Sequence, residues 1–361
     1  MLENPSQLYD LLCCPKDQSS LTTILLDDKS ANGHDQGALL CPSCKTLWSI
    51  CDGIPRFVNE GNVDHDIDIE MIRKAAGESP DITDEVIERN ISRLETWRDG
   101  DGGGWERDEM LFWENYYAEK LERGDKEWAV TYNRLIPRQK YLLSKLPRTI
   151  SRVLEIGCGT SGTLWVDKKF MDDKTYFGTD LSFNALKVSR SRMNGHHVLC
   201  DVNALPFRQG AMDAILGFGV LHHLPNHEQA IETLSGILDP GGWLGFAEKL
   251  KTCEKMQKST LVAYAKKRVM RQDRNHGSEE YVDGKNLIRL LDKICTNHYS
   301  CHYDYSVVRD VLDIISIHTL RLNSPTLTRI NIFMDNLVVK TLAPVHYLFQ
   351  PKQVTFVAQK Q

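Results

Sequence analysis

The sequence predicts an α/β protein, in which a mainly parallel sheet carries helices on both faces and a small β-rich module precedes it. Three observations support this fold class. Five apolar, strand-like segments follow one another between residues 153 and 248, and the first runs directly into a Gly-x-Gly-x-x-Gly turn over 157–162. Residues 1–60 differ, because they contain two Cys-Pro turns among short apolar runs. A parallel sheet is normally covered by helices on both faces.

Length and composition are those of an ordinary globular protein. The chain has 361 residues, enough for two domains, with 41% hydrophobic and 26% charged residues. Its formal net charge of −5 disfavours nucleic acid and an anionic membrane surface as partners. No apolar run reaches the roughly 20 residues that span a bilayer, and the N-terminus lacks a signal-peptide pattern. We therefore expect a cytoplasmic protein whose ten cysteines are metal ligands or buried thiols.

The first 60 residues carry the spacing of a metal site. Cys41 and Cys44 form a complete Cys-x-x-Cys turn, and Cys14 opens another turn in which Asp17 stands where a cysteine is expected. Two such turns present ligands at i and i+3, which is how a zinc ribbon builds a tetrahedral site. A module this small rarely has enough core to fold without a metal or a partner surface.

This segment resembles the Trm112-like zinc-ribbon family, whose members end in a strand similar to the Asp-Gly-Ile-Pro of 52–55. The resemblance implies bound zinc and a surface for a protein partner. The departure at Asp17 leaves three outcomes open: the carboxylate completes a Cys3Asp site, Cys13 or Cys51 replaces it, or the module keeps its fold without metal. The candidate zinc ligands are Cys14, Asp17, Cys41 and Cys44.

The strands of the core end in motifs that point to a bound nucleoside. The segment 175–180 ends in Asp180, 23 residues beyond Gly157, where a carboxylate can accept both ribose hydroxyls of an adenosine. The remaining motifs are, in order, a strand ending at Asp201, a Leu-Pro-Phe segment at 205–207, a Leu-His-His-Leu exit at 221–224 and a Leu-x-Pro-Gly-Gly turn at 238–242.

This ordered set resembles the class I S-adenosylmethionine (SAM)-dependent methyltransferases of the type 11-like group, closely over residues 150–250. The resemblance implies a Rossmann-like sheet and SAM as the cofactor. A nicotinamide-dependent dehydrogenase also uses such a glycine turn, but it explains neither Glu155 nor the segment 201–207.

The resemblance assigns a part of SAM to each motif. An acid before the glycine turn orders the methionine end, and the glycines let the cofactor approach the backbone. The acid that ends the second strand holds the ribose, and the acid after the third bonds the adenine amino group. The candidate cofactor-binding residues are, in that order, Glu155; Gly157 and Gly159; Asp180 with Leu181; and Asp201, with Val202 on the ring and Phe218 at the start of the loop that faces the sulfur.

The catalytic base is chosen from histidines, because an oxygen nucleophile needs a group that takes its proton and histidine titrates near neutrality. His222 and His223 leave the fourth strand at the cofactor edge, although paired histidines there are usually structural in such enzymes. His276 lies beside Gly277 in the expected lid and is a comparable candidate.

Further segments flank the core. Helices before the glycine turn close the pocket in related methyltransferases, and this part of the chain is rich in aromatic residues that either pack on the sheet or reach the substrate. After the fifth strand, an amphipathic helix at 286–294 and a final strand at 353–358 are expected. The predicted division is a zinc-ribbon module at 1–60, a helical linker and cap at 61–149, a SAM-binding core at 150–250, and a lid insert with final strands at 251–361.

Together these features predict a SAM-dependent enzyme that methylates an oxygen of a small molecule, such as a saccharide or a secondary metabolite. A large C-terminal insert suits a discrete ligand, and the net charge of −5 does not suit a phosphate backbone. Two alternatives stay open. The enzyme acts on RNA or protein and docks through the zinc module, or the SAM fold is a non-catalytic binding scaffold.

Overall fold

A computed structural model describes residues 6–57, 65–99, 105–123, 139–160, 164, 168–224, 226–251, 282–295, 300–304 and 353–361. Five parallel, largely buried strands form its centre: β5 (Arg152–Ile156), β6 (Thr175–Asp180), β7 (His196–Cys200), β8 (Met212–Phe218) and β9 (Leu238–Lys249). They lie in the order β7-β6-β5-β8-β9, so the direction of winding reverses between β5 and β8. Parallel α/β sheets bind ligands beyond the carboxyl ends of the strands at such a reversal.

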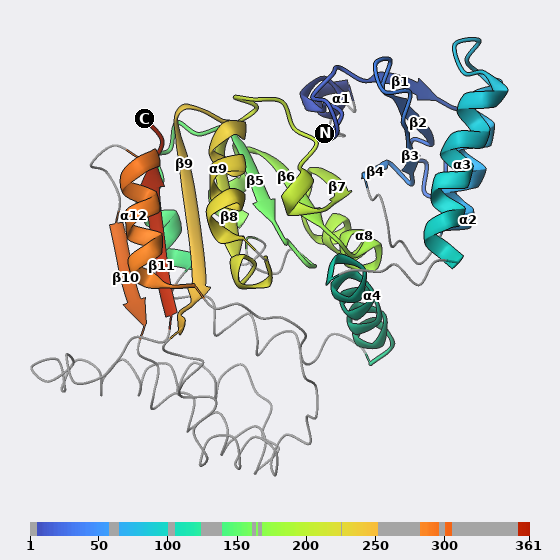
Figure 1. Cartoon of the computed structure of the whole chain (residues 1–361). Coiled ribbons are helices and arrows are strands. Elements are labelled where there is room, and N and C mark those ends of the chain that lie inside the picture. The colour runs from blue at the N-terminus through green and yellow to red at the C-terminus, as the bar shows by residue number, and fades with distance from the viewer. Residues whose placement is uncertain are drawn as a thin grey trace, which may run out of the picture.

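Two antiparallel strands extend the sheet beyond β9. They are β11 (Gln353–Gln359), which pairs with β9, and β10 (Ser300–Asp304), which pairs with β11. The predicted fold class, a Rossmann-like sheet with a small N-terminal β module, is confirmed (Figure 1).

Two hydrophobic cores cover the two faces of this sheet. Leu154 and Ile156 of β5 belong to the larger core, whereas Val153 joins the smaller one together with Leu142 and Leu146. Side chains alternate along a strand, so a run of apolar residues feeds both faces. The helices α9 (His227–Ile237) and α12 (Gly284–Ile294) lie side by side over the face of the larger core (Figure 1).

The helices of the core begin at polar caps. Ser182 precedes α8 (Phe183–Arg192) and accepts a hydrogen bond from the Ala185 amide, and Asp283 does the same for α12. Such side chains satisfy amides that have no partner within the helix, and they fix where each helix starts. The shorter helical elements are α1 (Ser6–Leu11), α7 (Lys168–Met171), η2 (Val202–Ala204) and η3 (Leu221–His223).

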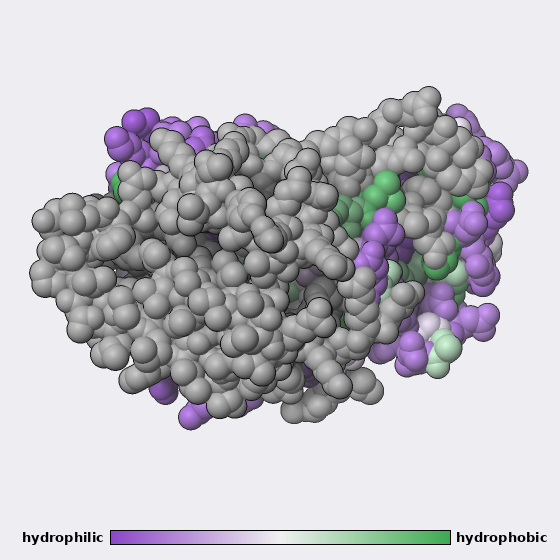
Figure 2. All heavy atoms as spheres, turned by 90° about the horizontal axis from the view of Figure 1, so that it is seen from below, coloured by the Kyte–Doolittle hydropathy of each residue, from purple (hydrophilic) through white to green (hydrophobic). Residues whose placement is uncertain are grey.

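The N-terminal module is an antiparallel meander with its own helical layer. Its strands are β1 (Thr22–Leu25), β2 (Gly37–Leu40), β3 (Leu47–Cys51) and β4 (Ile54–Phe57), and α2 (His65–Gly77) and α3 (Asp84–Asp99) pack against it. Seen from below, the outer rim on the side of α2 and α3 is mostly hydrophilic, with hydrophobic residues recessed toward the middle (Figure 2). These helices therefore cover the module, while α4 (Trp105–Arg123) contacts α8 of the core.

Strand β4 joins the module to the core. It pairs in parallel with β7, Arg56 opposite Leu199 and Phe57 opposite Cys200, so all eleven described strands form one sheet in the order β1-β2-β3-β4-β7-β6-β5-β8-β9-β11-β10. The turn before β4 uses Asp52 and Gly53, both at positive φ, which is the geometry of a tight hairpin turn.

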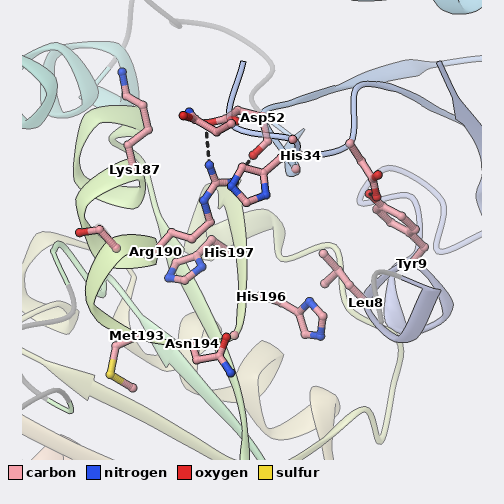
Figure 3. A pocket seen from close by; sticks show the side chains of 16 residues that line it. Leu8, Tyr9, His34, Asp52, Lys187, Arg190, Met193, Asn194, His196 and His197 are labelled. Carbon is pink, nitrogen blue, oxygen red and sulfur yellow. Dashed lines mark hydrogen bonds and ion pairs between the residues drawn. The ribbon is translucent and has the colours of Figure 1, made fainter. Parts of the chain in front are cut away.

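Arg190 of α8 holds that turn. Its guanidinium donates to the Asp52 backbone oxygen and pairs with the Asp52 carboxylate at 2.5 Å, and Ser30 donates to the other carboxylate oxygen at 2.6 Å. The contact lies on one wall of a 740 Å³ cavity between module and core, with Leu8 and Tyr9 on the opposite wall (Figure 3). The junction is thus both hydrogen-bonded and ion-paired.

No helix in the part of the chain that the structure describes combines the length and apolar character needed to cross a membrane.

Removing the Asp68 carboxylate will unfold the module at lower denaturant. Arg56 is almost fully buried and makes two bonds to Asp68, at 2.7 and 3.0 Å, so Asp68→Ala leaves a buried charge without its partner. Breaking one side of such a pair costs about 3–5 kcal/mol. Urea unfolding followed by tryptophan fluorescence measures the loss. The control is Glu70→Ala, which removes an exposed ion pair to Lys74 and leaves the midpoint unchanged. An Asp68→Ala midpoint equal to that of the control would contradict the expectation.

Candidate active site

A cavity of 160 Å³ opens at the carboxyl ends of the parallel strands, at the reversal between β5 and β8. Six of the predicted cofactor-binding residues line it: Gly157, Asp180, Leu181, Asp201, Val202 and Phe218. The other lining residues are Trp113, Tyr117, Cys200, Gly219, Val220, His223 and Leu224. The structure therefore brings most of the sequence-predicted set to one place.

The glycine turn leaves no room for a side chain at Gly157 or Gly159. Gly157 and Gly159 both have positive φ, at 57° and 53°. A Cβ on Gly157 would lie 2.6 Å from the Val220 side chain, and one on Gly159 would lie 2.5 Å from the Tyr117 hydroxyl. Glycine is needed at both positions for its backbone conformation and for space.

Asp180 ties the glycine turn to the start of α8. Its carboxylate accepts the Gly159 amide at 2.7 Å and the Ser182 amide at 2.9 Å. Burial raises the pKa of Asp180 to about 6, although these amides oppose the shift. A buried acceptor with a raised pKa faces the cavity where a ribose is expected.

Glu155 lies one layer behind the cavity. It is buried, and the Tyr176 hydroxyl donates to its carboxylate at 2.7 Å. Burial, followed by the nearby charge of Asp180, raises the pKa of Glu155 to about 8. Glu155 is not among the residues that line the cavity, and its expected contact with the methionine end of SAM stays a prediction.

The remaining edge of the cavity follows β7. Asp201 caps η2 by accepting the Asn203 amide at 2.8 Å, and Val202 in that turn is buried. Both residues line the cavity, and their contacts with the adenine amino group and ring stay a prediction. A carboxylate beside an apolar side chain is suited to that combination of contacts.

The two adjacent histidines in the loop after β8 have different surroundings. His222 is 2% exposed and its Nδ1 lies 2.9 Å from the Glu248 carboxylate, whereas His223 lines the cavity with its ring 5.3 Å from that of Trp113. Burial lowers the pKa of His222, with Glu248 opposing the shift. His276, the third predicted candidate, lies outside the described residues.

Some site residues have no simple sequence signal. Glu114 on α4 accepts from the Ser182 hydroxyl and from the Asn184 amide at 3.3 Å, which fastens α4 to the N-terminus of α8. Trp113 and Tyr117 on α4, by contrast, belong to the aromatic-rich segment that the sequence predicts to pack on the sheet or to reach the substrate, and both line the cavity. Glu248 is fully buried behind the loop.

A second cluster lies in the N-terminal module. One ligand atom from each of Cys14, Asp17, Cys41 and Cys44 lies within 4.8 Å of all the others, and the Cys14 and Cys44 sulfurs are 3.6 Å apart. A tetrahedral zinc with Zn–S bonds of about 2.3 Å separates two sulfurs by about 3.7 Å. Three sulfurs and a carboxylate therefore fit zinc. Among the described residues, neither Cys13 nor Cys51 belongs to this group.

Helix α3 supports the second metal turn. Arg89 donates to the Cys44 and Lys45 carbonyls at 3.2 and 3.1 Å, and Asn90 donates to Lys45 at 3.0 Å. Asn90 also accepts the Leu47 amide at 2.9 Å. Lys45 has positive φ, so these bonds hold a backbone shape that the residue rarely adopts alone.

Comparison with known proteins places the core among methyltransferases. Residues 154–246 match the family described as "Methyltransferase domain". The mouse tRNA (carboxymethyluridine(34)-5-O)-methyltransferase ALKBH8 is 26% identical over 213 residues, covering 58% of this chain and 28% of that protein. The mouse "Probable tRNA methyltransferase 9B" is 37% identical over 98 residues, covering 26% of this chain and 21% of that protein. The chain spans less than a third of the length of these relatives.

Among solved structures, the geranyl diphosphate C-methyltransferase from Streptomyces coelicolor A3(2) superposes with a TM-score of 0.48 at 12% identity, covering 73% of this chain and all of that one. The segment that matches the methyltransferase family, 154–246, covers the parallel strands β5 to β9 almost completely. Residues 154–246 thus match a methyltransferase domain, in the part of the chain where the sequence predicts one.

Proposed function

We propose that the chain binds SAM in the cavity at the carboxyl ends of β5–β8 and transfers its methyl group to an oxygen of a small-molecule acceptor. The observation that carries this proposal is the pairing of two carboxylates, Asp180 and Asp201, with a glycine turn that a Cβ would fill. SAM supplies an activated methyl on a positively charged sulfur. This chain's residues bind and orient it: Asp180 accepts the ribose hydroxyls, Asp201 the adenine amino group, and Val202 packs on the ring.

Catalysis then depends mainly on placing the acceptor oxygen in line with the methyl group. His223 is the candidate to take the acceptor proton, because it lies in the cavity wall while His222 is turned to Glu248. His222 and His276 stay candidates for supporting roles. The net charge of −5 favours a small acceptor over a polyanion.

A second candidate acceptor is tRNA. Two relatives are named as tRNA methyltransferases, and one of those names specifies an oxygen as the acceptor atom. In that case, the zinc module or a protein bound to it docks the nucleic acid. Binding through phosphates would weaken steeply with added salt.

We also propose that the N-terminal module binds one zinc through Cys14, Asp17, Cys41 and Cys44. The Ser19 amide donates to the Asp17 carboxylate at 3.0 Å and lowers the pKa of Asp17 to about 2, so the oxygen ligand is ionised. The metal ties the turn at 14–17 to the turn at 41–44, which joins β2 to β3, and so supports the meander whose strand β4 pairs with the core.

The Asp180→Asn variant will bind SAM about 10- to 100-fold more weakly, because hydrogen bonds to a charged acceptor contribute about 1.5–3 kcal/mol. For the wild type, the affinity falls as the pH is lowered through about 6, since Asp180 then gains a proton. The variant loses that dependence. Isothermal titration between pH 5 and 8 measures both effects, with the exposed Asp173→Asn as the control. Equal affinities of Asp180→Asn and wild type would contradict the proposed site.

The acceptor is identified by release of S-adenosylhomocysteine from SAM with hydroxylated small molecules or with total tRNA. We expect product with a small molecule, at a rate insensitive to salt; product with tRNA alone would replace this acceptor by the second candidate. His223→Ala will lower turnover about 10²–10⁴-fold with SAM affinity within threefold. His34→Ala, at the module junction, is the matched control. Full turnover by His223→Ala would remove that residue as the base.

Metal analysis of the purified chain will find one zinc per molecule. Cys41→Ser will lose it, Asp17→Ala will release it faster to a chelator, and Asp17→Cys will hold it more tightly, since thiolate is the stronger zinc ligand. Cys51→Ser, a buried thiol outside the cluster, keeps its zinc. A wild-type chain without zinc, or a Cys41→Ser chain that retains it, would contradict the site.

A further inference from the structure

We infer that Glu248 is the positioning residue of the cofactor cavity: its buried carboxylate holds the loop after β8 in the shape that lines the cavity. The inference rests on the proposed function, because the shape of this loop matters to activity only when the cavity takes SAM.

One carboxylate serves three donors of this loop. Oε1 of Glu248 accepts the backbone amides of Val220 and Leu221, each at 2.9 Å, and Oε2 lies 2.9 Å from Nδ1 of His222. The Glu248 and His222 side chains are 0% and 2% exposed. Water therefore cannot replace any of these bonds, and an uncharged, shorter side chain would leave buried amides without an acceptor.

The carboxylate is ionised in this setting. Burial alone would raise the pKa of Glu248, but the bonds from His222, Leu221 and Val220 outweigh burial and lower it. An ionised carboxylate only accepts hydrogen bonds, so Nδ1 of His222 carries the hydrogen and Nε2 does not in the neutral ring. Glu248 thus sets the tautomer and the orientation of His222.

Through these bonds, Glu248 controls the wall of the cavity. Phe218, Gly219, Val220, His223 and Leu224 all line it. The Gly219 amide donates to the Ala247 carbonyl at 2.9 Å, so the loop is fixed to β9 at two neighbouring residues.

Two contacts carry the loop's position to the rest of the site. The Val220 side chain lies against the glycine turn, since a Cβ on Gly157 would come within 2.6 Å of it. The His223 ring lies 4.2 Å from that of His222 and 5.3 Å from that of Trp113. If this loop moved, it would therefore displace both the glycine turn, which SAM approaches, and Trp113, which covers the cavity.

Two substitutions separate positioning from mere stability. Glu248→Ala removes all three acceptor contacts. Glu248→Gln keeps an oxygen for the two amides but presents an amide NH2 to His222, which can accept from it only if its own hydrogen moves to Nε2. The glutamine variant is therefore expected to preserve the loop and to change the histidine tautomer.

The experiment combines SAM titration with 15N NMR of the His222 ring in the free, full-length chain. We expect hydrogen on Nδ1 in the wild type and on Nε2 in Glu248→Gln, with SAM affinity within threefold. For Glu248→Ala we expect at least a tenfold loss of affinity with the far-ultraviolet circular dichroism retained. The control is Glu228→Gln, which changes an exposed carboxylate paired with Lys293 on the neighbouring α12 and leaves both readouts unchanged.

The outcomes distinguish this inference from the proposed function. A wild type that shows Nδ1–H in His222 but binds no SAM would overturn the proposed cofactor and leave the Glu248–His222 contact established. A folded Glu248→Ala chain with wild-type affinity would overturn the inference, as would a Glu248→Gln chain whose tautomer does not change. If Glu248→Ala does not fold, the tautomer and affinity of Glu248→Gln decide.

Discussion

Two buried carboxylates, each hydrogen-bonded to another segment of the chain, give the cavity its shape. Asp180 connects the glycine turn with the first residues of α8, and Glu248 connects β9 with the loop after β8. Burying such charge is expensive unless hydrogen bonds replace the lost water. Burial raises the pKa values of Asp180 and Glu155 in spite of their hydrogen bonds, so these donors offset the cost of burial only in part.

Helix α8 contacts both this cavity and the N-terminal module. Its first turn lies beside Asp180, and Arg190 in its last turn holds the Asp52 turn that precedes β4. Strand β4 in turn completes the sheet beside β7, whose end carries Asp201. The module is therefore a structural neighbour of two cavity residues, although it contributes no side chain to the cavity lining among the described residues.

The features predicted from sequence are those with a local cause. Strand periodicity, the glycine turn and the acid after each strand depend on neighbours within a few residues, and these residues do gather at one edge of the sheet. Each Cys-Pro turn likewise fixes its own pair of candidate metal ligands, and the fold of the module brings the two pairs together. The different surroundings of the two histidines in η3 could not be predicted in this way. His222 lies against Glu248 and His223 lines the cavity, but nothing in the sequence distinguishes the two residues. The pairing of β4 with β7 and the contact of Glu114 on α4 with the start of α8 join distant segments that no local pattern relates.

The pairing of β4 with β7 has a consequence for synthesis on the ribosome. Arg56 and Leu199, which lie opposite each other, are 143 residues apart in the chain. At about 5–20 residues per second, the edge of β4 waits roughly 7 to 30 seconds before its partner strand emerges. An unpaired strand edge is a template for pairing with other chains, and a charged residue on it lowers that risk. Arg56 places a charge on this edge until Asp68, twelve residues later in the chain, pairs with it.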